Sequence, residues 1–524
     1  MALFREGEPG DAMYVVRSGR LAVEIDGAGD EPVRLAGRGQ VIGELALLDA
    51  APRSATVRAV RDSTVVELTR EHFESLVAGR PEIALALARE LGDRLRHSRA
   101  LPESRSTRPA TIALVPLDDA PVAEVADALL AELRAGGSVA RFDGDEREIP
   151  TDDEAVAAAF GPLLDDAEGD NDQVLLVARR PLDDPWTIFC LRQADRVVAL
   201  GVGSRPPPEA RAEPRLRGAD VALVGEPLSA GRCTAWLDAV EGRAIHLVRR
   251  APGFSGDIAR LGRRLAGRSL GVVLSGGGAR GFAHVGVLEE LLRAGLRIDR
   301  VGGCSMGAYV GALHAMGLDP HAMRERCREE FVRRNPLGDY TVPRVALLRG
   351  AKGVSMLERT FGSLSIQELA TPYFCVSADL VTADLVVHRR GGLAPAVGAS
   401  MCLPALLPPR RRGERLLVDG GVLNNLPVEP MQADGEGPVL AIDVTGPFSV
   451  STAPGAPLPG LKETLSRAIA VGSVHAVEDA RERADVLVCP DVADIGMLEW
   501  DALDRVVEAG RAAGRAAVPA ALAL

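Results

Sequence analysis

The fold is decided by the stretch GVVLSGGGARGFAHVGVLEELLRAGLRIDRVGGCSMGAYVGALHAMG, residues 271–317. It begins with a short apolar strand, a glycine-rich loop and an amphipathic helix, and then continues with a second strand, a tight turn and a second helix. Strands that alternate with helices in this way are typical of a parallel sheet covered by helices. We therefore expect an α/β domain with a mainly parallel sheet in the C-terminal part of the chain.

The second strand of this stretch ends in Gly303-Cys-Ser-Met-Gly307, which has the G-x-S-x-G spacing of a nucleophile elbow. In such an elbow the glycines allow a sharp turn, and the serine hydroxyl stands clear of the sheet at the positive N-terminal end of the helix. The context predicts that Ser305 is a nucleophile and that Gly303 and Gly307 form the elbow around it. The alternative is a turn with a purely structural role.

The first strand is followed by Gly276-Gly-Gly-Ala-Arg-Gly281, which has two interpretations. Its first, third and sixth positions fit a dinucleotide-binding fingerprint, but that fold needs an acidic residue where the second strand ends, and this chain has the serine elbow there. Beside a nucleophile, the N–H groups of consecutive glycines can form an oxyanion hole. We favour an oxyanion hole built from Gly276, Gly277 and Gly278, with Arg280 as a further positive charge.

A nucleophilic serine needs a base, and histidine is the usual one. Of the eight histidines, four in this part of the chain are considered as bases: His284, His314, His321 and His388. Each stays open as a base, although a structural or surface role is more common for a histidine in such a position. The segment Leu416-Leu-Val-Asp-Gly-Gly-Val422 offers Asp419 instead, where an apolar strand breaks into a glycine turn. A desolvated aspartate with a raised pKa can act as the base directly, and the alternative is an aspartate that only begins the turn.

Four segments resemble, in the same order, the conserved blocks of the patatin-like phospholipases. They are Gly276–Gly281, Gly303–Gly307, Ala399–Pro404 with Pro408-Pro409, and Asp419–Gly421 followed by Asn424–Pro427. This resemblance implies a serine hydrolase of lipid esters in which Ser305 and Asp419 form a Ser–Asp dyad. It also implies that the glycine loop and Arg280 form the oxyanion hole and that catalysis needs no cofactor or metal. The hydrolase domain is expected over residues 269–524.

Residues 106–268 are expected to form a middle α/β domain, which serves as a linker or as a docking domain. Apolar strands alternate with helical segments there, and no nucleophile, metal set or phosphate loop is assembled. The segments Thr111–Pro116, Pro185–Asp195 and Leu261–Gly267 resemble the region that precedes the catalytic domain in neuropathy target esterase and its bacterial relatives. This further resemblance implies that the substrate is a phospholipid or lysophospholipid at a membrane surface.

Residues 1–105 are expected to form an antiparallel β-roll with C-terminal helices. Short strand-like runs broken by glycine and aspartate are followed by a helical pattern over Glu71–Leu95, of which Pro81–Leu95 would form a lid or hinge. Phe4–Asp11, Gly43–Leu48 and Pro52–Thr56 resemble the cyclic-nucleotide-binding domain.

This last resemblance implies binding roles at five positions. Arg53 would pair with the cyclic phosphate, Glu44 would accept from the ribose 2′-hydroxyl, and Gly43, Ser54 and Ala55 would present donors to the phosphate. Serine rather than threonine at position 54 favours cyclic AMP (cAMP) as an allosteric ligand. Two alternatives stay open: a vestigial module that binds nothing, and a cyclic-nucleotide receptor whose hydrolase fold is inactive.

Composition narrows the class of protein further. A formal net charge of −12 over 524 residues argues against nucleic-acid binding, and seven cysteines without C-x-x-C pairs argue against a disulfide framework or a zinc site. No apolar stretch is long enough to span a bilayer, and residues 1–10 lack the apolar core of a signal peptide. We expect a cytoplasmic protein, or one that is peripheral at the inner face of the membrane.

Overall fold

The computed structural model describes residues 2–25, 34–37, 40–44, 52–79, 110–225, 229–250, 252–433, 435–446, 464, 467 and 471–524. The chain forms two compact units, one of residues 1–227 and 235–266 and the other of residues 228–234 and 267–524. The predicted helix Pro81–Leu95 and the predicted boundary at residue 105 lie outside the described residues. Among the helices of the described ranges, none is both long and apolar enough to cross a bilayer.

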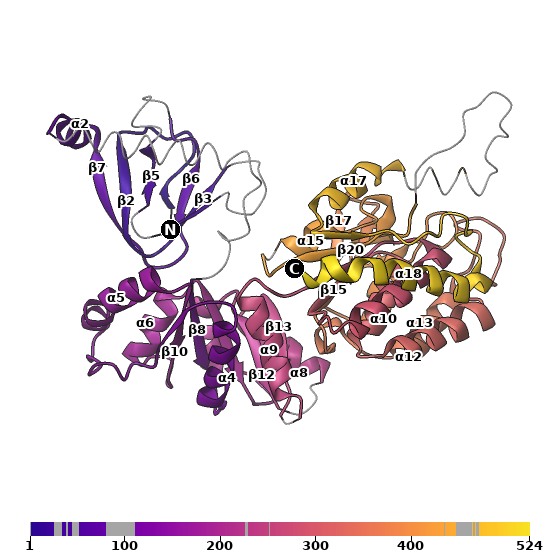
Figure 1. The fold of residues 1–524 in the computed structure, drawn as a ribbon, viewed down its shortest axis with the longest axis horizontal. Helices are drawn as coiled ribbons and strands as arrows, with labels where there is room; N and C mark the ends of the chain where they lie inside the picture. Colours follow the sequence, from indigo (N-terminus) through magenta and orange to yellow (C-terminus); the bar gives the residue numbers. More distant parts are fainter. Residues whose placement is uncertain are drawn as a thin grey trace. The chain divides into compact units, whose positions relative to one another are not determined.

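The first unit begins with the predicted antiparallel β-roll (Figure 1). One sheet has the order β1-β6-β3-β4 and the other the order β5-β2-β7. The elements are β1 (Ala2–Phe4), β2 (Ala12–Ser18), β3 (Leu21–Glu24), β4 (Arg34–Ala36), β5 (Val41–Ile42), β6 (Thr56–Ala59), β7 (Thr64–Thr69) and helix α2 (Arg70–Gly79). A small apolar core that includes Phe4, Val16 and Val57 fills the roll.

The predicted middle α/β layer is a six-stranded sheet with the order β13-β12-β11-β8-β10-β9, in which every pairing is parallel. Its strands are β8 (Thr111–Pro116), β9 (Val139–Phe142), β10 (Gln173–Val177), β11 (Arg196–Gly201), β12 (Asp220–Val224) and β13 (Ala244–Val248). Helices α4 (Val122–Arg134) and α9 (Phe254–Leu265) share one apolar core with these strands. The remaining helices are α5 (Asp153–Asp170), α6 (Pro185–Gln193), α7 (Pro208–Ala212) and α8 (Ala230–Ala239).

The second unit contains the predicted mainly parallel sheet, whose order is β18-β19-β16-β15-β14-β20-β21, with β17 paired to β16. Strands β16, β15, β14, β20 and β21 run parallel, and β17, β18 and β19 are antiparallel additions at one side. The strands are β14 (Gly271–Leu274), β15 (Arg300–Gly303), β16 (Tyr373–Asp379), β17 (Leu385–His388), β18 (Arg410–Arg412), β19 (Arg415–Asp419), β20 (Val439–Ile442) and β21 (Val486–Val488).

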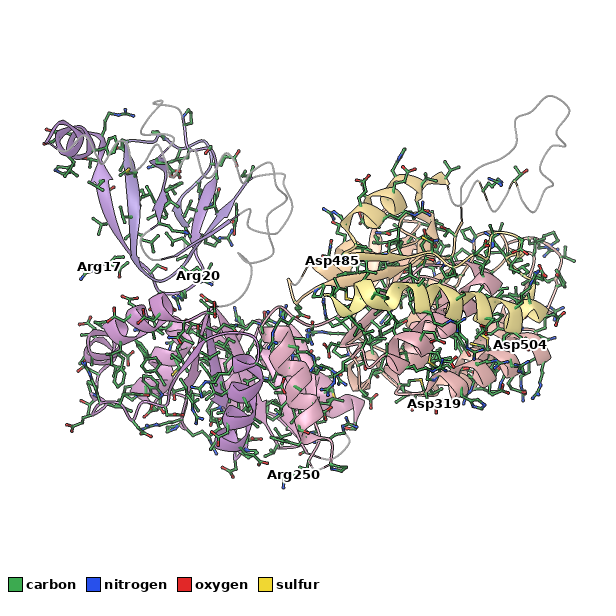
Figure 2. All side chains as sticks on the ribbon, in the orientation of Figure 1. Arg17, Arg20, Arg250, Asp319, Asp485 and Asp504 are labelled. Atoms are coloured by element: carbon green, nitrogen blue, oxygen red, sulfur yellow. The ribbon has the colours of Figure 1, made fainter. Side chains whose placement is uncertain are left out.

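Helices cover both faces of this sheet, and each face has its own apolar core. They are α10 (Ala283–Arg293), α11 (Met306–Ala315), α12 (Pro320–Cys327), α13 (Ala351–Phe361), α14 (Leu393–Ser400), α15 (Val428–Gln432), α17 (Val474–Arg483) and α18 (Leu503–Leu522). Helix α18 packs along α10, and its first turn is fixed by Asp504, labelled in Figure 2, which accepts hydrogen bonds from Arg324 and Arg328. These hydrogen bonds, first those from Arg328, lower the pKa of Asp504 to about 2. The chain order of the parallel strands reverses beside β14, and loops at such a point commonly form binding sites.

Candidate active site

Ser305 lies in a strained turn between β15 and α11. Its backbone has φ 54° and ψ −119°, a conformation that residues with a side chain seldom adopt outside functional sites. The turn is tight because α11 starts directly against β14: a Cβ on Gly307 would lie 2.2 Å from the carbonyl oxygen of Leu274. The observed geometry is that of the predicted elbow, and it leaves Ser305 partly exposed at the N-terminal end of α11.

Asp419 lies at the end of β19 and is 2% exposed. Its Oδ1 accepts a hydrogen bond of 2.8 Å from the Gly421 N–H, and the Cys304 Sγ lies 3.5 Å from the same oxygen. Its Oδ2 is buried and has no hydrogen-bond partner within the described part of the chain. Burial raises the pKa of Asp419 to about 6, and the Ser305 hydroxyl, the Gly421 N–H and the Cys304 thiol each offset a part of that rise.

The Ser305 hydroxyl is close enough to Asp419 to stabilise its carboxylate, although the pair does not meet the distance and angle of a formed hydrogen bond. Catalytic hydrogen bonds are often loose until substrate binds. Because Oδ1 is already engaged, Oδ2 is the oxygen that remains for the proton of Ser305.

The glycine loop after β14 lies against the serine, since a Cβ on Gly276 would be 3.0 Å from the Cβ of Ser305. The N–H of Gly276 donates to the carbonyl of Asn425 at 3.2 Å, and Asn425 Nδ2 donates to the carbonyl of Gly276 at 3.1 Å. Gly278 has φ 57°, and a Cβ there would lie 2.1 Å from the carbonyl oxygen of Met497. Among the described residues, the N–H groups of Gly277 and Gly278 have no hydrogen-bond partner.

Arg280 contacts backbone carbonyls of two other loops. Its guanidinium donates to the carbonyls of Ile495 at 2.7 Å, Thr445 at 2.9 Å and Ala493 at 3.2 Å. Burial lowers the pKa of Arg280 from its ordinary value, and the three carbonyls accept three of its five N–H donors. Arg280 therefore fastens the glycine loop to two other loops, and the N–H of Gly276 is likewise engaged by Asn425.

Two of the histidines that stayed open as bases are held by other groups. His284 Nε2 lies 2.8 Å from the carbonyl oxygen of Ser275, and burial lowers its pKa to about 4. Burial and then the positive charge of Arg412 likewise lower the pKa of His388 to about 4. Arg412 donates to Nδ1 of His388 at 3.0 Å, so Nε2 carries the hydrogen and donates to the Ser377 Oγ at 2.7 Å.

Three further residues support the site, and sequence reasoning assigned them no role. Ser400 Oγ accepts the N–H of Ser305 at 3.0 Å, and Asn425 and Met497 hold the glycine loop. Ser400 and Asn425 lie inside two of the segments that resemble the patatin-like phospholipases, so the sequence did contain a signal that could have identified them. Nothing local in the sequence marks Met497. In the described ranges, no group of three or more His, Cys, Asp or Glu side chains could hold a metal ion.

An apolar pocket opens at Ser305. Its lining comes from α11, α13 and the loops around them, and four methionines contribute to it. Its members are Gly278, Ser305, Met306, Phe331, Pro336, Leu337, Gly353, Met356, Leu357, Gly398, Met401, Leu403, Leu407, Arg410, Met497, Leu498 and Trp500. The one charged member, Arg410, has no carboxylate partner among the described residues, and its Nε is buried without a hydrogen-bond partner.

The five residues predicted to bind a cyclic nucleotide come from two places in the roll. Gly43 and Glu44 follow β5, whereas Arg53, Ser54 and Ala55 precede β6; residues 45–51 between them lie outside the described part. Glu44, Arg53 and Ala55 are buried, and Ser54 is exposed.

Arg53 points into the roll. Its guanidinium donates to the carbonyls of Ala12 at 2.8 Å and Gly43 at 3.2 Å, and lies 4.1 Å from the centre of the Phe4 ring. Arg53 thereby connects the two halves of the predicted site.

The sequence matches two family models, "Patatin-like phospholipase" over residues 272–431 and "Cyclic nucleotide-binding domain" over residues 2–80. An uncharacterised NTE family protein of Mycobacterium tuberculosis is 38% identical over 99% of this chain and 90% of its own length. Human patatin-like phospholipase domain-containing protein 6 is 31% identical over 84% of this chain and 37% of its own length. The lysophospholipase nte1 of Aspergillus fumigatus is 26% identical over 98% of this chain and 41% of its own length.

The mycobacterial relative matches almost from end to end, and the two family models fall on the roll and on the sheet that carries Ser305. The chain therefore belongs to the NTE family of patatin-like phospholipases, as a lipid ester hydrolase with a cyclic nucleotide-binding domain.

Proposed function

We propose that the chain hydrolyses the acyl ester of phospholipids or lysophospholipids, with Ser305 as the nucleophile and Asp419 as its base. The observation that carries this proposal is the pairing of a strained Ser305 with a buried Asp419 whose pKa is raised to about 6, at the end of an apolar pocket. A base is most effective when its pKa lies near the working pH.

In the acylation step, Oδ2 of Asp419 accepts the proton of Ser305 while Ser305 Oγ attacks the ester carbonyl carbon. The electron pair of the carbonyl moves to its oxygen, and the free N–H groups of Gly277 and Gly278 stabilise that oxyanion. When the C=O bond re-forms, the bond to the lipid alcohol breaks and the alcohol oxygen takes the proton from Asp419. An acyl ester on Ser305 remains.

In the deacylation step, Asp419 takes a proton from a water molecule that attacks the acyl carbon. The second oxyanion forms at the same N–H groups and collapses, the bond to Ser305 Oγ breaks, and Oγ recovers the proton. The fatty acid leaves. We assign the oxyanion to Gly277 and Gly278 because the N–H of Gly276 is engaged by the carbonyl of Asn425, and we assign Arg280 the task of holding the glycine loop through its bonds to backbone carbonyls.

The pocket supports a lipid substrate with a phosphate group. Its methionine, leucine and aromatic side chains offer an apolar site of the kind that an acyl chain needs. Among the described residues that line the pocket, Arg410 carries the one charge, and a guanidinium without a carboxylate partner suits a lipid phosphate.

A panel of lipids tests this proposal: diacyl phospholipids, lysophospholipids, monoacylglycerol and p-nitrophenyl butyrate. We expect fatty acid release to be highest from phosphate-containing lipids and to disappear in Ser305→Ala, whereas Ser363→Ala, a change at an exposed serine after α13, leaves it intact. A fluorophosphonate probe should label the wild type and the Ser363 variant but not the Ser305 variant. Undiminished turnover in Ser305→Ala would rule out the dyad.

We also propose that a cyclic nucleotide, with cAMP favoured, binds at Gly43, Glu44, Arg53, Ser54 and Ala55 and regulates the hydrolase. In this proposal residues 1–105, 106–268 and 269–524 are separate domains, and the protein works in the cytoplasm at the inner face of a membrane. The hydrogen bond from Nη1 of Arg53 to the carbonyl of Gly43, which brings Arg53 beside the segment that carries Glu44, supports the nucleotide site. A ligand shifts activity only if it binds two states of the protein differently, so the test is the activity with and without nucleotide.

A further inference from the structure

The loop between the π-helical turn Arg328–Arg333 and α13 carries an unusual exposed surface. Its outer part, residues 340–347, is called the apolar tip here. Tyr340, Val342 and Val345 are 74%, 75% and 74% exposed, the highest values among the large apolar side chains of the described residues, and Leu347 is 41% exposed. Apolar side chains that gather outside a core usually mark an interaction site.

The base of this loop is firmly held, so the exposure of the tip is built into the fold. Leu348 is 1% exposed and packs with Cys402 and Leu407. The N–H groups of Leu347 and Leu348 donate to the carbonyls of Ala405 and Leu406 at 2.9 Å and 3.0 Å. A loop with such a base presents its tip to solvent without collapsing onto the core.

The base of the loop that carries the apolar tip packs against the wall of the pocket that opens at Ser305. Leu407, against which Leu348 packs, lines that pocket, and so does Leu337 from the start of the same loop. The apolar tip is therefore carried by a loop whose base borders this pocket.

The charge around the apolar tip is opposite to that of the whole chain. Residues 340–352 contain Arg344, Arg349 and Lys352 and no acidic residue, although the chain has a net charge of −12. Among the described residues these three cations have no ion pair with a carboxylate, and Arg411 on β18 has none either. The flanking carboxylates are Asp339 and Glu414.

We propose that the apolar tip is a membrane-docking loop, which inserts Tyr340, Val342 and Val345 into an anionic phospholipid surface while Arg344, Arg349 and Lys352 contact the lipid headgroups. A few apolar side chains bind a bilayer only weakly, and basic residues near an anionic surface add to that affinity. The inference rests on the proposed function, because it supplies the surface from which a lipid substrate would enter the pocket.

The test is sedimentation of the full chain with vesicles, in a Ser305→Ala background so that the lipid is not consumed. Vesicles of phosphatidylcholine with phosphatidylglycerol are compared with vesicles of phosphatidylcholine alone. We expect binding to the anionic vesicles that weakens with salt, and a loss of about tenfold or more in partitioning for Val342→Asp with Val345→Asp. Arg344→Glu with Arg349→Glu should also weaken binding and remove most of its salt dependence.

The matched control carries Leu522→Asp with Leu524→Asp, two exposed apolar positions at the far end of α18, which over twenty residues is about 30 Å long. This control should bind vesicles like the parent protein. The tip substitutions are also made in the enzyme that keeps Ser305. These variants should hydrolyse p-nitrophenyl butyrate at the wild-type rate, which would show that the fold and the chemistry are intact.

Equal sedimentation of the tip variant and its parent would overturn the proposal, and so would equal binding to neutral and anionic vesicles. A wild-type dimer that the tip substitutions dissociate, seen by light scattering, would assign the apolar tip to a second copy of the chain instead. If the wild type binds vesicles but hydrolyses no ester, the proposed function fails while the docking loop stands.

Discussion

The two candidate sites of the chain differ in whether their polar groups are already occupied. Beside Ser305, the N–H groups of Gly277 and Gly278 and the Oδ2 of Asp419 have no partner among the described residues, so they are ready for a reacting ester. In the roll, Nη1 of Arg53 already donates to the carbonyls of Ala12 and Gly43 and the guanidinium lies over the Phe4 ring, although its Nε has no partner among the described residues. In the proposed mechanism a substrate meets free groups at the first site, whereas at the second a phosphate meets a guanidinium of which one nitrogen is already engaged.

The largest effect should come from removing the base. Asp419→Asn should lower kcat/KM by about a thousandfold, within the range typical of general base catalysis. In the wild type, kcat/KM should rise with pH through about 6 and then level off, because the carboxylate is the active form and the pKa of Asp419 is raised to about 6. A pH profile that is flat from 5 to 8, or an Asn variant with full activity, would place the base elsewhere.

The same substitution should stabilise the fold. Because the folded-state pKa of Asp419 is above its ordinary value of 3.8, the buried charge destabilises the protein above about pH 6, and this penalty disappears below pH 3.8. Asp419→Asn should therefore raise the free energy of unfolding at pH 7 by up to about 3 kcal/mol.

Asp379, at the end of β16, is the matched control for stability. Burial alone would raise its pKa, but hydrogen bonds from the N–H groups of Val381 and Leu416 hold it below the ordinary value. Its contribution is stabilising at neutral pH and is lost in acid, so Asp379→Asn should lower Tm at pH 7 where Asp419→Asn raises it. Thermal unfolding at pH 7 and pH 4 measures both, and shifts of the same sign would contradict the contrast.

A smaller effect is expected at the wall of the pocket. Arg410→Gln should raise KM about tenfold for lysophosphatidylcholine, because a charged hydrogen bond to phosphate is lost, and should leave KM for p-nitrophenyl butyrate unchanged. Arg411→Gln, at the next position on β18, should change neither value. If KM rises equally for both substrates, Arg410 shapes the pocket and does not bind the phosphate.

The smallest effect should come from the nucleotide. Since Nη1 of Arg53 is already engaged by two backbone carbonyls, we expect saturating cAMP to change kcat/KM by about fivefold or less. Arg53→Gln should remove this response, and 5′-AMP serves as the control ligand. An unchanged kcat/KM in the presence of cAMP, together with no binding by calorimetry, would leave the roll with a structural role.

The parts of the hydrolase that could be predicted from the sequence are those with a local signal. The glycine loop, the elbow and the strand that ends in Asp419 each combine an apolar run with a glycine turn, and the structure forms β14, α10, β15, α11 and β19 where these patterns predict them. Strand β9 and helix α5 were not predicted: β9 has four residues at a sheet edge, and α5 contains Pro162.

The contacts that hold the glycine loop after β14 could not be predicted, because they join residues that are far apart in the sequence. Arg280 and Ile495 are 215 positions apart, and Asn425 and Gly276 are 149 apart. Arg280 is next to three glycines in the sequence, so a role in the oxyanion hole was a reasonable prediction. Only the folded chain brings three backbone carbonyls to its guanidinium.

These distant contacts also set the time at which the enzyme becomes competent during synthesis. The ribosome makes Ser305 and Asp419 first, but the loop that carries Gly277 and Gly278 is fastened by Ala493, Ile495 and Met497, which emerge later. A nascent chain would already display its nucleophile while the oxyanion donors were still unfixed. On the proposed mechanism, the hydrolase should therefore gain activity only after these late residues have been made and have packed against the glycine loop.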